Sequence, residues 1–446
     1  MREGSLDAPT RHPIAWQDQE FTDPSAVEKE LKRVFDICHG CRRCFNLCDS
    51  FPRLFDLIDE SPTQELDGVE PKEFKSVVDA CTLCDMCFLT KCPYVPPHEF
   101  NLDFPHLMLR YRAMEHKQGK LSFSDRQLAQ TDRNGKLAGM VSSVANWATS
   151  RENKTVGPLL RSAADLDASA ELPKFASHSL LNLSASRPEL NLHAPAYGRK
   201  VVLYATCFGN YNSPDVGIDT RFVLARNGVE TEVVYPKCCG MPMLEQGRLD
   251  DVAANARHVA QAMKEWISKG YDIVALVPSC ALMLKFEWPL ILPDDPDVRA
   301  LARSTFDISE YVVDIARKEG IAPGLEATPA TLSVHMACHA RAQNMGQKAA
   351  EMLRLLPQAT VKVIERCSGH GGSWGFKRET FEVGMKVGRP VARQAAQSGA
   401  EFLMSECPLA GVHIQQGIER IGGDGPRPTL ITHPIQMLAR AYQGGT

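Results

Sequence analysis

Two short stretches that end in cysteine decide the fold of this 446-residue chain: residues 233–240 (VVYPKCCG) and residues 361–369 (VKVIERCSG). Each begins with β-branched apolar residues, which favour a strand, and each ends in a cysteine, a second small residue and a glycine. Strand-like runs at 201–206 and 331–337, and at 273–279 and 402–406, also end at a cysteine. The three pairs are offset by 131, 129 and 127 residues, and this nearly constant offset indicates a duplicated unit. The strand-ending cysteines are Cys207, Cys238, Cys280, Cys338, Cys367 and Cys407.

Helical segments lie between these strands, as in residues 252–264, where Val252, Ala256, Val259 and Met263 recur at helical spacing. Continuous apolar strands that alternate with such helices predict a parallel, doubly wound α/β unit. Ligands of open parallel sheets bind beyond the carboxyl ends of the strands. The cysteine loops are therefore expected to converge on two pockets, the alternative being that free thiols simply fill the core.

The N-terminal region contains eight cysteines in two runs. The first run has the spacing C-x2-C-x2-C-x3-C and the second C-x2-C-x2-C-x4-C, followed directly by Pro93. Three thiolates at this spacing, with a distant fourth, are typical of [4Fe–4S] clusters, and in two-cluster ferredoxins the fourth cysteine binds the other cluster. Zinc is the alternative, but it needs two separated ligand pairs rather than three cysteines at strict spacing plus a fourth. The predicted crossed sets are Cys38, Cys41, Cys44 with Cys92, and Cys81, Cys84, Cys87 with Cys48.

Four regions are predicted along the chain. Helical patterns between and after the cysteine runs indicate an α-helical ferredoxin module with two clusters over residues 25–115. Residues 116–198 are rich in Ser, Ala, Asn and Pro and predict a linker with helices, in which we find no chemistry. Two duplicated, doubly wound α/β units follow at 199–325 and 326–446, the second of them depleted in cysteine.

The tandem units resemble the cysteine-rich CCG domains of heterodisulfide reductase B subunits, through Cys207, the Cys238-Cys239-Gly240 turn and Cys280. Together with the N-terminal runs, the whole chain resembles the C subunit of anaerobic glycerol-3-phosphate dehydrogenase and its relatives, including glycolate oxidase iron–sulfur subunits. The resemblance implies an iron–sulfur electron-transfer subunit. Its electrons would come from a flavoprotein dehydrogenase, of glycerol-3-phosphate or 2-hydroxy acid type, and pass towards a quinone or another acceptor.

The chain departs from the full CCG pattern, which ends in C-x2-C. Met283 and Ala410 stand where the last cysteines would be, and Ser368 replaces the partner of Cys367. The first pocket keeps four thiols, enough for one cluster, whereas the second keeps three. A cluster in the second pocket would need an open iron or another ligand, and a pocket without a cluster is the other alternative. The four residues considered as an extra ligand or as an outer hydrogen-bonding partner are Ser368, His335, His339 and His370.

Composition limits the functions of the chain. The sequence has 50 Lys and Arg against 54 Asp and Glu, a net charge of −4 that predicts no nucleic-acid binding. No flavin or nicotinamide fingerprint is found, so a flavoprotein or other redox subunit is the expected partner. Thiols at metal-binding spacing, rather than a disulfide framework, predict that the protein is located in the reducing cytoplasm. The longest apolar stretch, residues 273–283, is too short to span a membrane, and the N-terminus lacks a secretory signal. Contact with the inner face of the cytoplasmic membrane would come through a partner.

Three other functions remain open. In the first, a CCG site is itself the catalyst, as in heterodisulfide reductase, and acts on a disulfide or persulfide. In the second, the chain donates electrons to a rubrerythrin-type peroxidase. In the third, the clusters are structural parts of a scaffold. Substrate oxidation by this chain is not expected, so any enzymatic role is that of an oxidoreductase subunit.

Overall fold

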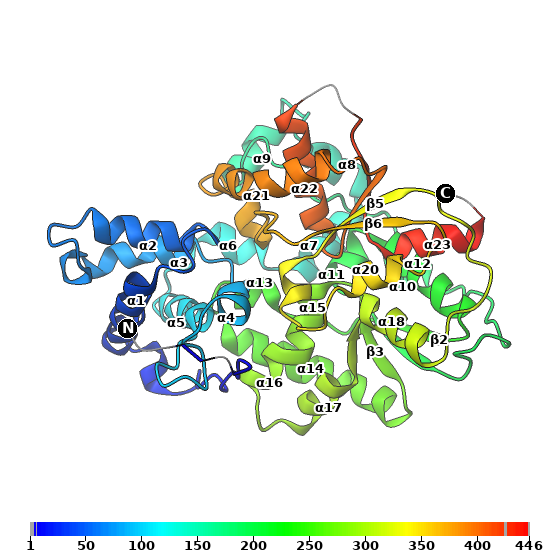
Figure 1. The fold of residues 1–446 in the computed structure, drawn as a ribbon, viewed down its shortest axis with the longest axis horizontal. Helices are drawn as coiled ribbons and strands as arrows, with labels where there is room; N and C mark the ends of the chain where they lie inside the picture. The colour runs from blue at the N-terminus through cyan, green and yellow to red at the C-terminus, as the bar shows by residue number, and fades with distance from the viewer. Residues whose placement is uncertain (1–3, 6, 423–425, 445–446) are drawn as a thin grey trace.

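Two four-stranded parallel sheets form the centre of the molecule (Figure 1). The computed structural model describes residues 4–5, 7–422 and 426–444. The strand order is β2-β1-β3-β4 in the first sheet and β6-β5-β7-β8 in the second, so the two units share one topology. The prediction of two repeated α/β units with parallel sheets is therefore confirmed. The strands are β1 (Lys200–Tyr204), β2 (Glu230–Val234), β3 (Asp272–Ala275), β4 (Thr305–Asp307), β5 (Thr331–His335), β6 (Thr360–Ile364), β7 (Phe402–Ser405) and β8 (Thr429–Ile431).

The sequence predicts three strands in each unit, and the structure has four. The added strands, β4 and β8, have three residues each, too few for an apolar run to stand out. They pair with β3 and β7 and extend each sheet by one strand. In both units the order reverses between the first and third strands, and a ligand of a doubly wound sheet binds at such a switch point.

Helices cover both sheets. Among them, α14 buries Val252, Ala256, Val259 and Met263 on one face, which agrees with its predicted periodicity. The helices of the first unit are α11 (Cys207–Tyr211), α12 (Pro214–Arg226), α13 (Met241–Leu244), α14 (Leu249–Ser268), α15 (Pro278–Leu282), the π-helix η4 (Met283–Glu287), α16 (Trp288–Ile291), α17 (Pro296–Ser304) and α18 (Ile308–Lys318). Those of the second are α19 (Cys338–Arg341), α20 (Lys348–Leu353), the 3-10 helix η5 (Gly372–Phe376), α21 (Phe381–Ala396), α22 (Pro408–Ile421) and α23 (Ile435–Gln443).

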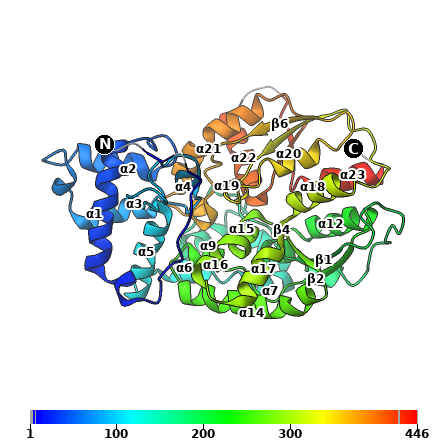
Figure 2. The same cartoon turned by 60° about the horizontal axis from the view of Figure 1, so that its bottom comes forward.

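The N-terminal region is helical and lies at one end of the molecule, beside the first unit (Figures 1 and 2). An extended N-terminal segment ties the two together, because Ile14 N–H and Trp16 Nε1 donate to the carbonyls of Leu290 and Ile291, at 2.8 and 2.9 Å. Its helices are η1 (Gln19–Thr22), α1 (Pro24–Cys41), α2 (Ser50–Asp59), η2 (Leu66–Gly68), η3 (Pro71–Glu73), α3 (Phe74–Asp79), α4 (Met86–Thr90) and α5 (Phe104–Lys117). The connecting region contains α6 (Phe123–Leu128), α7 (Thr131–Met140), α8 (Ser142–Thr149), α9 (Gly157–Ala163) and α10 (Leu180–Leu183).

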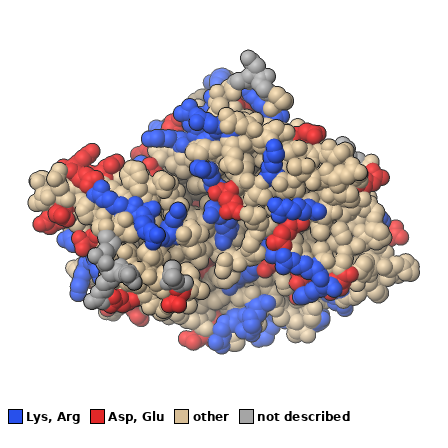
Figure 3. Space-filling view, in the orientation of Figure 1, with Lys and Arg blue, Asp and Glu red and all other residues tan. Residues whose placement is uncertain are grey.

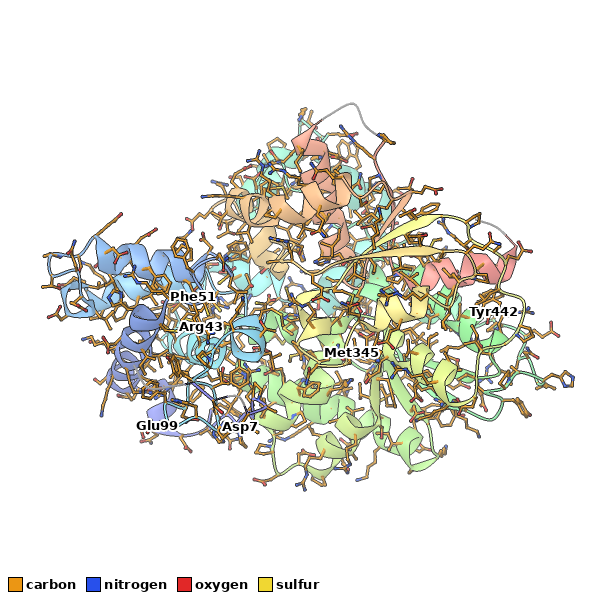
Figure 4. All side chains as sticks on the ribbon, viewed as in Figure 1. Asp7, Arg43, Phe51, Glu99, Met345 and Tyr442 are labelled. Carbon is orange, nitrogen blue, oxygen red and sulfur yellow. The ribbon has the colours of Figure 1, made fainter. Side chains whose placement is uncertain are left out.

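Two large hydrophobic cores join these regions. One core runs from Phe35 and Phe74 of the N-terminal helices to Met263 and Trp288 of the first unit. The other lies between the two units, where α23 packs against α12 and the hydroxyl of Tyr442, labelled in Figure 4, donates to the Ala322 carbonyl at 2.8 Å. The shared cores hold the cysteine loops of all three regions in fixed positions. Within the described ranges, no helix is long and apolar enough to cross a membrane.

Candidate iron–sulfur sites

The first unit brings four thiols together at the carboxyl ends of β1, β2 and β3. Cys207 begins α11, Cys238 and Cys239 follow β2, and Cys280 lies in α15. The Sγ atoms of Cys207 and Cys238 are 3.8 Å apart. Hydrogen bonds from Cys207 and Cys239 lower the pKa of Cys238 well below that of a free thiol, and Cys239 also interacts with Cys280. We refer to these four residues as the four-thiol pocket.

The second unit repeats this arrangement with one thiol fewer. Cys338 begins α19, Cys367 follows β6 and Cys407 follows β7. Hydrogen bonding to Cys338 lowers the pKa of Cys367 to about 7. Ser368 occupies the place of Cys239 and is 6% exposed, so a buried hydroxyl stands here in place of a buried thiol. We refer to Cys338, Cys367 and Cys407 as the three-thiol pocket.

The turns that begin at Cys238 in the first unit and at Cys367 in the second unit have the same backbone conformation at their glycines. Gly240 and Gly369 have φ values of +84° and +75°, a conformation that favours glycine. In this conformation the Gly240 N–H points to Sγ of Cys238 at 3.5 Å, and the Gly369 N–H points to Sγ of Cys367 at 3.4 Å. Backbone donors of this kind stabilise a thiolate and tune the potential of a bound cluster.

The three candidate histidines of the second unit differ in their free ring nitrogens. His335 uses both, at 2.9 Å from Ser405 Oγ and 2.9 Å from the Arg366 carbonyl. His339 also uses both, at 2.8 Å from Ser279 Oγ and 3.3 Å from the Leu83 carbonyl. His370 is buried, and its Nδ1 has no hydrogen-bond partner among the described residues. Of the three, only His370 has a nitrogen free for a further ligand.

His335 takes a structural position that a tyrosine fills in the first unit. The Tyr204 hydroxyl donates to the Lys237 carbonyl at 2.6 Å, as His335 Nε2 bonds to the Arg366 carbonyl. The two contacts hold equivalent peptide groups, since Lys237 directly precedes Cys238 and Arg366 directly precedes Cys367. Burial lowers the pKa of His335 to about 4, so the ring is neutral at physiological pH. This arrangement favours an outer hydrogen-bonding role for His335.

The N-terminal cysteines gather into two crossed groups. Cys38, Cys41, Cys44 and Cys92 line one small cavity, which Arg43 and Phe51 also line. Figure 4 labels these last two residues in the N-terminal region, where Arg43 lies in the turn after α1 and Phe51 lies in α2. Burial and the neighbouring Cys92 and Cys41 raise the pKa of Cys44 to about 12. Cys48 lies beside the second run instead. Burial and, after it, the neighbouring thiols Cys84 and Cys81 raise its pKa. We call the groups the first N-terminal set and the second N-terminal set, the latter comprising Cys48, Cys81, Cys84 and Cys87.

The four thiol groups form a continuous series. Cys87 and Cys44 are electrostatic neighbours and link the two N-terminal sets. Hydrogen bonding to Cys367 and to Cys84 raises the pKa of Cys338, which places the second N-terminal set against the three-thiol pocket. Cys407 and Cys280 are neighbours in turn and connect the two pockets. His339 lies at this junction, since it contacts Leu83 of the N-terminal region and Ser279 of the first unit.

Three functional features were missed from the sequence. The first is Asp132 of α7, whose Oδ2 accepts the Cys238 N–H at 3.1 Å and whose other oxygen accepts from the Tyr235 hydroxyl. The connecting region, in which the sequence shows no chemistry, therefore covers the four-thiol pocket.

The second missed feature is Glu406, which is fully buried and accepts the Ala337 N–H at 3.2 Å. Burial raises its pKa well above that of an ordinary carboxyl.

The third missed feature is a buried ion network beside the second N-terminal set. Arg11 contacts Asp85 at 2.7 Å, Asp103 at 2.8 Å and Glu287 at 3.3 Å. Burial lowers the pKa of Arg11, but the three carboxylates offset this effect and raise it well above its ordinary value. Asp85 separates Cys84 from Cys87, so the network fixes the loop that carries them. The residues are far apart in sequence, and no local pattern announces their contact.

The donor sets fit iron–sulfur chemistry. They consist of thiols that are buried or half-buried, with backbone N–H groups directed at sulfur in both units. Across residues 4–5, 7–422 and 426–444, no group of three or more Cys, His, Asp or Glu side chains is arranged to hold a single metal ion. A cluster distributes its thiolates over separate irons, so its ligands need not converge on one point.

Comparison with known proteins shows what parts of the chain are similar to. Residues 201–285 and 332–415 each match the Cysteine-rich domain family, CCG, and these two segments contain both thiol pockets. The chain is similar to the C subunit of the anaerobic glycerol-3-phosphate dehydrogenase of Escherichia coli, with 27% identity over 317 residues that cover 70% of this chain and 76% of the relative. The resemblance expected from the sequence is confirmed.

Two further relatives share parts of the chain. One is the B subunit of the fumarate reductase (CoM/CoB) of Methanothermobacter marburgensis, at 26% identity over 252 residues, 55% of this chain and 47% of the relative. The other is the lactate utilization protein A of Bacillus cytotoxicus, at 28% identity over 235 residues, 50% of this chain and 93% of the relative. The chain thus resembles two subunits of oxidoreductases and a lactate utilization protein, whose names refer to different substrates.

Proposed function

We propose that this chain is an iron–sulfur electron-transfer subunit of a larger oxidoreductase. The two N-terminal sets would hold two [4Fe–4S] clusters in a ferredoxin-like module over residues 25–115. The four-thiol pocket of residues 199–325 would hold a further cluster. Bound clusters of this kind accept and release electrons one at a time.

The three-thiol pocket of residues 326–446 would also hold a cluster. One of its irons would then have no thiolate ligand from this pocket and would be bound by another kind of residue. His370 is the candidate residue because its Nδ1 is buried and unpaired within the part of the chain that the structure describes. Ser368 is the second candidate, although its hydroxyl already accepts the His370 N–H at 3.4 Å.

The single observation that carries the proposal is the contact between Cys84 and Cys338. It joins the N-terminal sets to the pockets of the α/β units, so the thiol groups lie in one series instead of at isolated sites. Donor–acceptor distance governs electron transfer, and a series of adjoining sites gives an electron a path through the chain. A scaffold with structural clusters has no need of such a series.

The names of the relatives support a proposal for the electron donor. A flavoprotein dehydrogenase acting on glycerol 3-phosphate or a 2-hydroxy acid is the proposed donor, in line with relatives named for glycerol-3-phosphate dehydrogenase and lactate utilization. A quinone or another carrier is the proposed acceptor. The proposed location is the cytoplasm, with contact to the inner face of the membrane through a partner subunit.

Electron paramagnetic resonance of the anaerobically purified, fully reduced protein tests the proposal. Adjoining reduced clusters broaden or split each other's spectra, so we expect an interaction spectrum in the natural protein. In Cys338→Ala, the broadening that the three-thiol pocket contributes should be lost, while the iron of the two N-terminal sets stays. The matched control is Ser333→Ala, a buried residue on β5, the strand that precedes Cys338, and outside the thiol groups.

A protein without redox-active iron, or one whose cluster spectra are those of isolated centres, contradicts the proposal. The same protein should be supplied with a disulfide and a reductant. Steady disulfide turnover that is lost in Cys338→Ala would identify the chain as a catalytic reductase instead.

A further inference from the structure

A groove of about 610 Å³ lies between β6 and α21 on the second unit. One wall is β6, an edge strand of its sheet, and the other is the outer face of α21. Nothing in the proposed function uses this groove. Five of its lining residues are positively charged, namely Lys362, Arg366, Lys386, Arg389 and Arg393.

The charges of the groove are unbalanced. None of these five side chains has an ion-pair partner within the described residues, and none of the residues that line the groove is acidic. Figure 3 shows Lys and Arg side chains on the part of the surface where α21 and β6 lie in Figure 1. The net charge of −4 therefore hides a local positive surface.

Protection of a sheet edge explains only part of this pattern. A lysine such as Lys362 on an edge strand prevents pairing with another sheet. The helix, however, places Lys386, Arg389 and Arg393 at spacings of three and four residues, which puts like charges side by side on one face. Such repulsion destabilises a helix, so the stripe is better explained by an anionic ligand than by stability.

One end of the groove lies beside the three-thiol pocket. Arg366 lines the groove and directly precedes Cys367, and its carbonyl holds His335 at 2.9 Å. Lys386 lies between Gly384 and Gly388, and both glycines approach the Ser368–Gly369 turn closely enough that no Cβ would fit. A molecule in the groove would therefore be close to the second pocket.

We propose that this groove docks the acidic surface of an electron-carrying protein. The inference rests on the proposed function, because it places the docking surface beside one of the proposed redox sites. In one exchange the reduced carrier loses one electron and this chain gains it, or the reverse, with no bond made or broken. Complementary charge speeds such encounters and orients the partner, and small, charged interfaces are typical of transient redox pairs.

Two other anionic occupants fit the groove less well. A small polyanion would need a built site with buried polar side chains, but the charged residues that line the groove are all exposed and the one buried polar residue of the lining is Ser333. Single-stranded nucleic acid would need aromatic side chains for base stacking, and the groove lining contains none. The position beside the thiol pocket favours a redox protein over both.

The test compares two double charge reversals in the holoprotein. Arg389→Glu with Arg393→Glu alters the groove, and Arg299→Glu with Arg303→Glu is the matched control on α17, where both arginines are exposed and have no ion pair in the described chain. Calorimetry at low and high salt measures binding of an acidic flavodoxin and of basic cytochrome c. Stopped-flow spectroscopy then measures electron exchange with each carrier.

We expect the natural protein to bind flavodoxin at low salt, with an affinity that falls as salt rises. The groove variant should bind flavodoxin at least about tenfold more weakly, whereas the control should stay within about twofold. Binding of cytochrome c should not weaken in the groove variant. Iron content and the reduced spectra should be unchanged in both variants, so that loss of the clusters is recognised separately as failure of the proposed function.

Several results would overturn the docking proposal. These are an absence of flavodoxin binding at low salt, binding that does not respond to salt, and equal weakening in both variants. Tight binding of pyrophosphate or of a DNA duplex at physiological salt, lost in the groove variant while flavodoxin binding stays, would assign the groove to that ligand instead.

Discussion

Replacing Arg11 with methionine should loosen the loop that carries Cys84 and Cys87. The guanidinium is the only side chain that contacts Asp85, Asp103 and Glu287 together within the described structure. The side chains of Asp85 and Glu287 are 5% and 4% exposed, so water cannot replace the lost cation. His106, at 3.2 Å from Asp103 and 3.3 Å from Glu287, is the remaining partner and does not reach Asp85.

The magnitude follows from this geometry. Removing one partner of a buried ion pair costs about 3–5 kcal/mol, because the other charge stays buried and uncompensated. Arg11→Lys keeps the charge but loses the fork that reaches three carboxylates, and should cost about 2 kcal/mol. Arg187→Met is the exposed control, since Arg187 is 63% exposed and its pair with Glu232 should contribute at most about 1 kcal/mol.

Hydrogen–deuterium exchange of the anaerobic holoprotein measures this effect locally. A loss of 3–5 kcal/mol should speed exchange at residues 81–90 by roughly 10²-fold to 5 × 10³-fold. Exchange in β5 should stay at the natural rate, which distinguishes local loosening from global unfolding. Equal exchange at residues 81–90 in Arg11→Met and Arg187→Met would refute the reasoning.

Three further predictions concern the sites and the core. Cys92→Ser should remove the cluster signal of the first N-terminal set and spare the second, and Cys48→Ser should do the reverse; spectra that follow the uncrossed sets would exclude the crossed arrangement. Ser368→Cys should restore a fourth thiol to the second unit and increase or stabilise its iron, as measured by iron analysis after exposure to a chelator, with Ser368→Ala as the control. Burial lowers the pKa of His433 to about 3, against 6.5 in the unfolded chain. The neutral ring therefore stabilises the fold above pH 6.5, and that stability is lost as the pH falls from 6.5 towards 3. In denaturant titrations, the destabilisation of the natural protein between pH 7 and 4.5 should exceed that of His433→Gln by about 2–3 kcal/mol.

The sequence predicts the features that repeat or keep a strict spacing. Strands that end at Cys207, Cys238 and Cys280, and their counterparts in the second unit, are visible because each is an apolar run and because the offset recurs. The depletion of the second unit is also readable, because Ser368 interrupts a repeated turn. Strands β4 and β8 escape prediction since three residues carry too little pattern.

Contacts between distant segments cannot be read from local pattern. Asp132 reaches the four-thiol pocket, and Arg11 meets Glu287, only because the shared hydrophobic cores bring these segments together. The same is true of the three histidines, which have equal standing in the sequence. Their hydrogen bonds in the folded chain separate His370, with a free nitrogen, from His335 and His339. The net charge likewise gives no sign of the positive groove, because its residues come together only when β6 and α21 lie side by side in the folded chain.

The central claim is that the cysteines of this chain form linked, redox-active iron–sulfur sites. A reductive titration of the anaerobically purified protein, with iron and acid-labile sulfide measured on the same sample, tests it most directly. We predict about eight iron and eight sulfide for the N-terminal sets and further iron for the pockets, with visible absorbance that is bleached by reductant and restored by oxidant. A colourless protein that contains zinc and no sulfide, and that takes up no electrons, would contradict it.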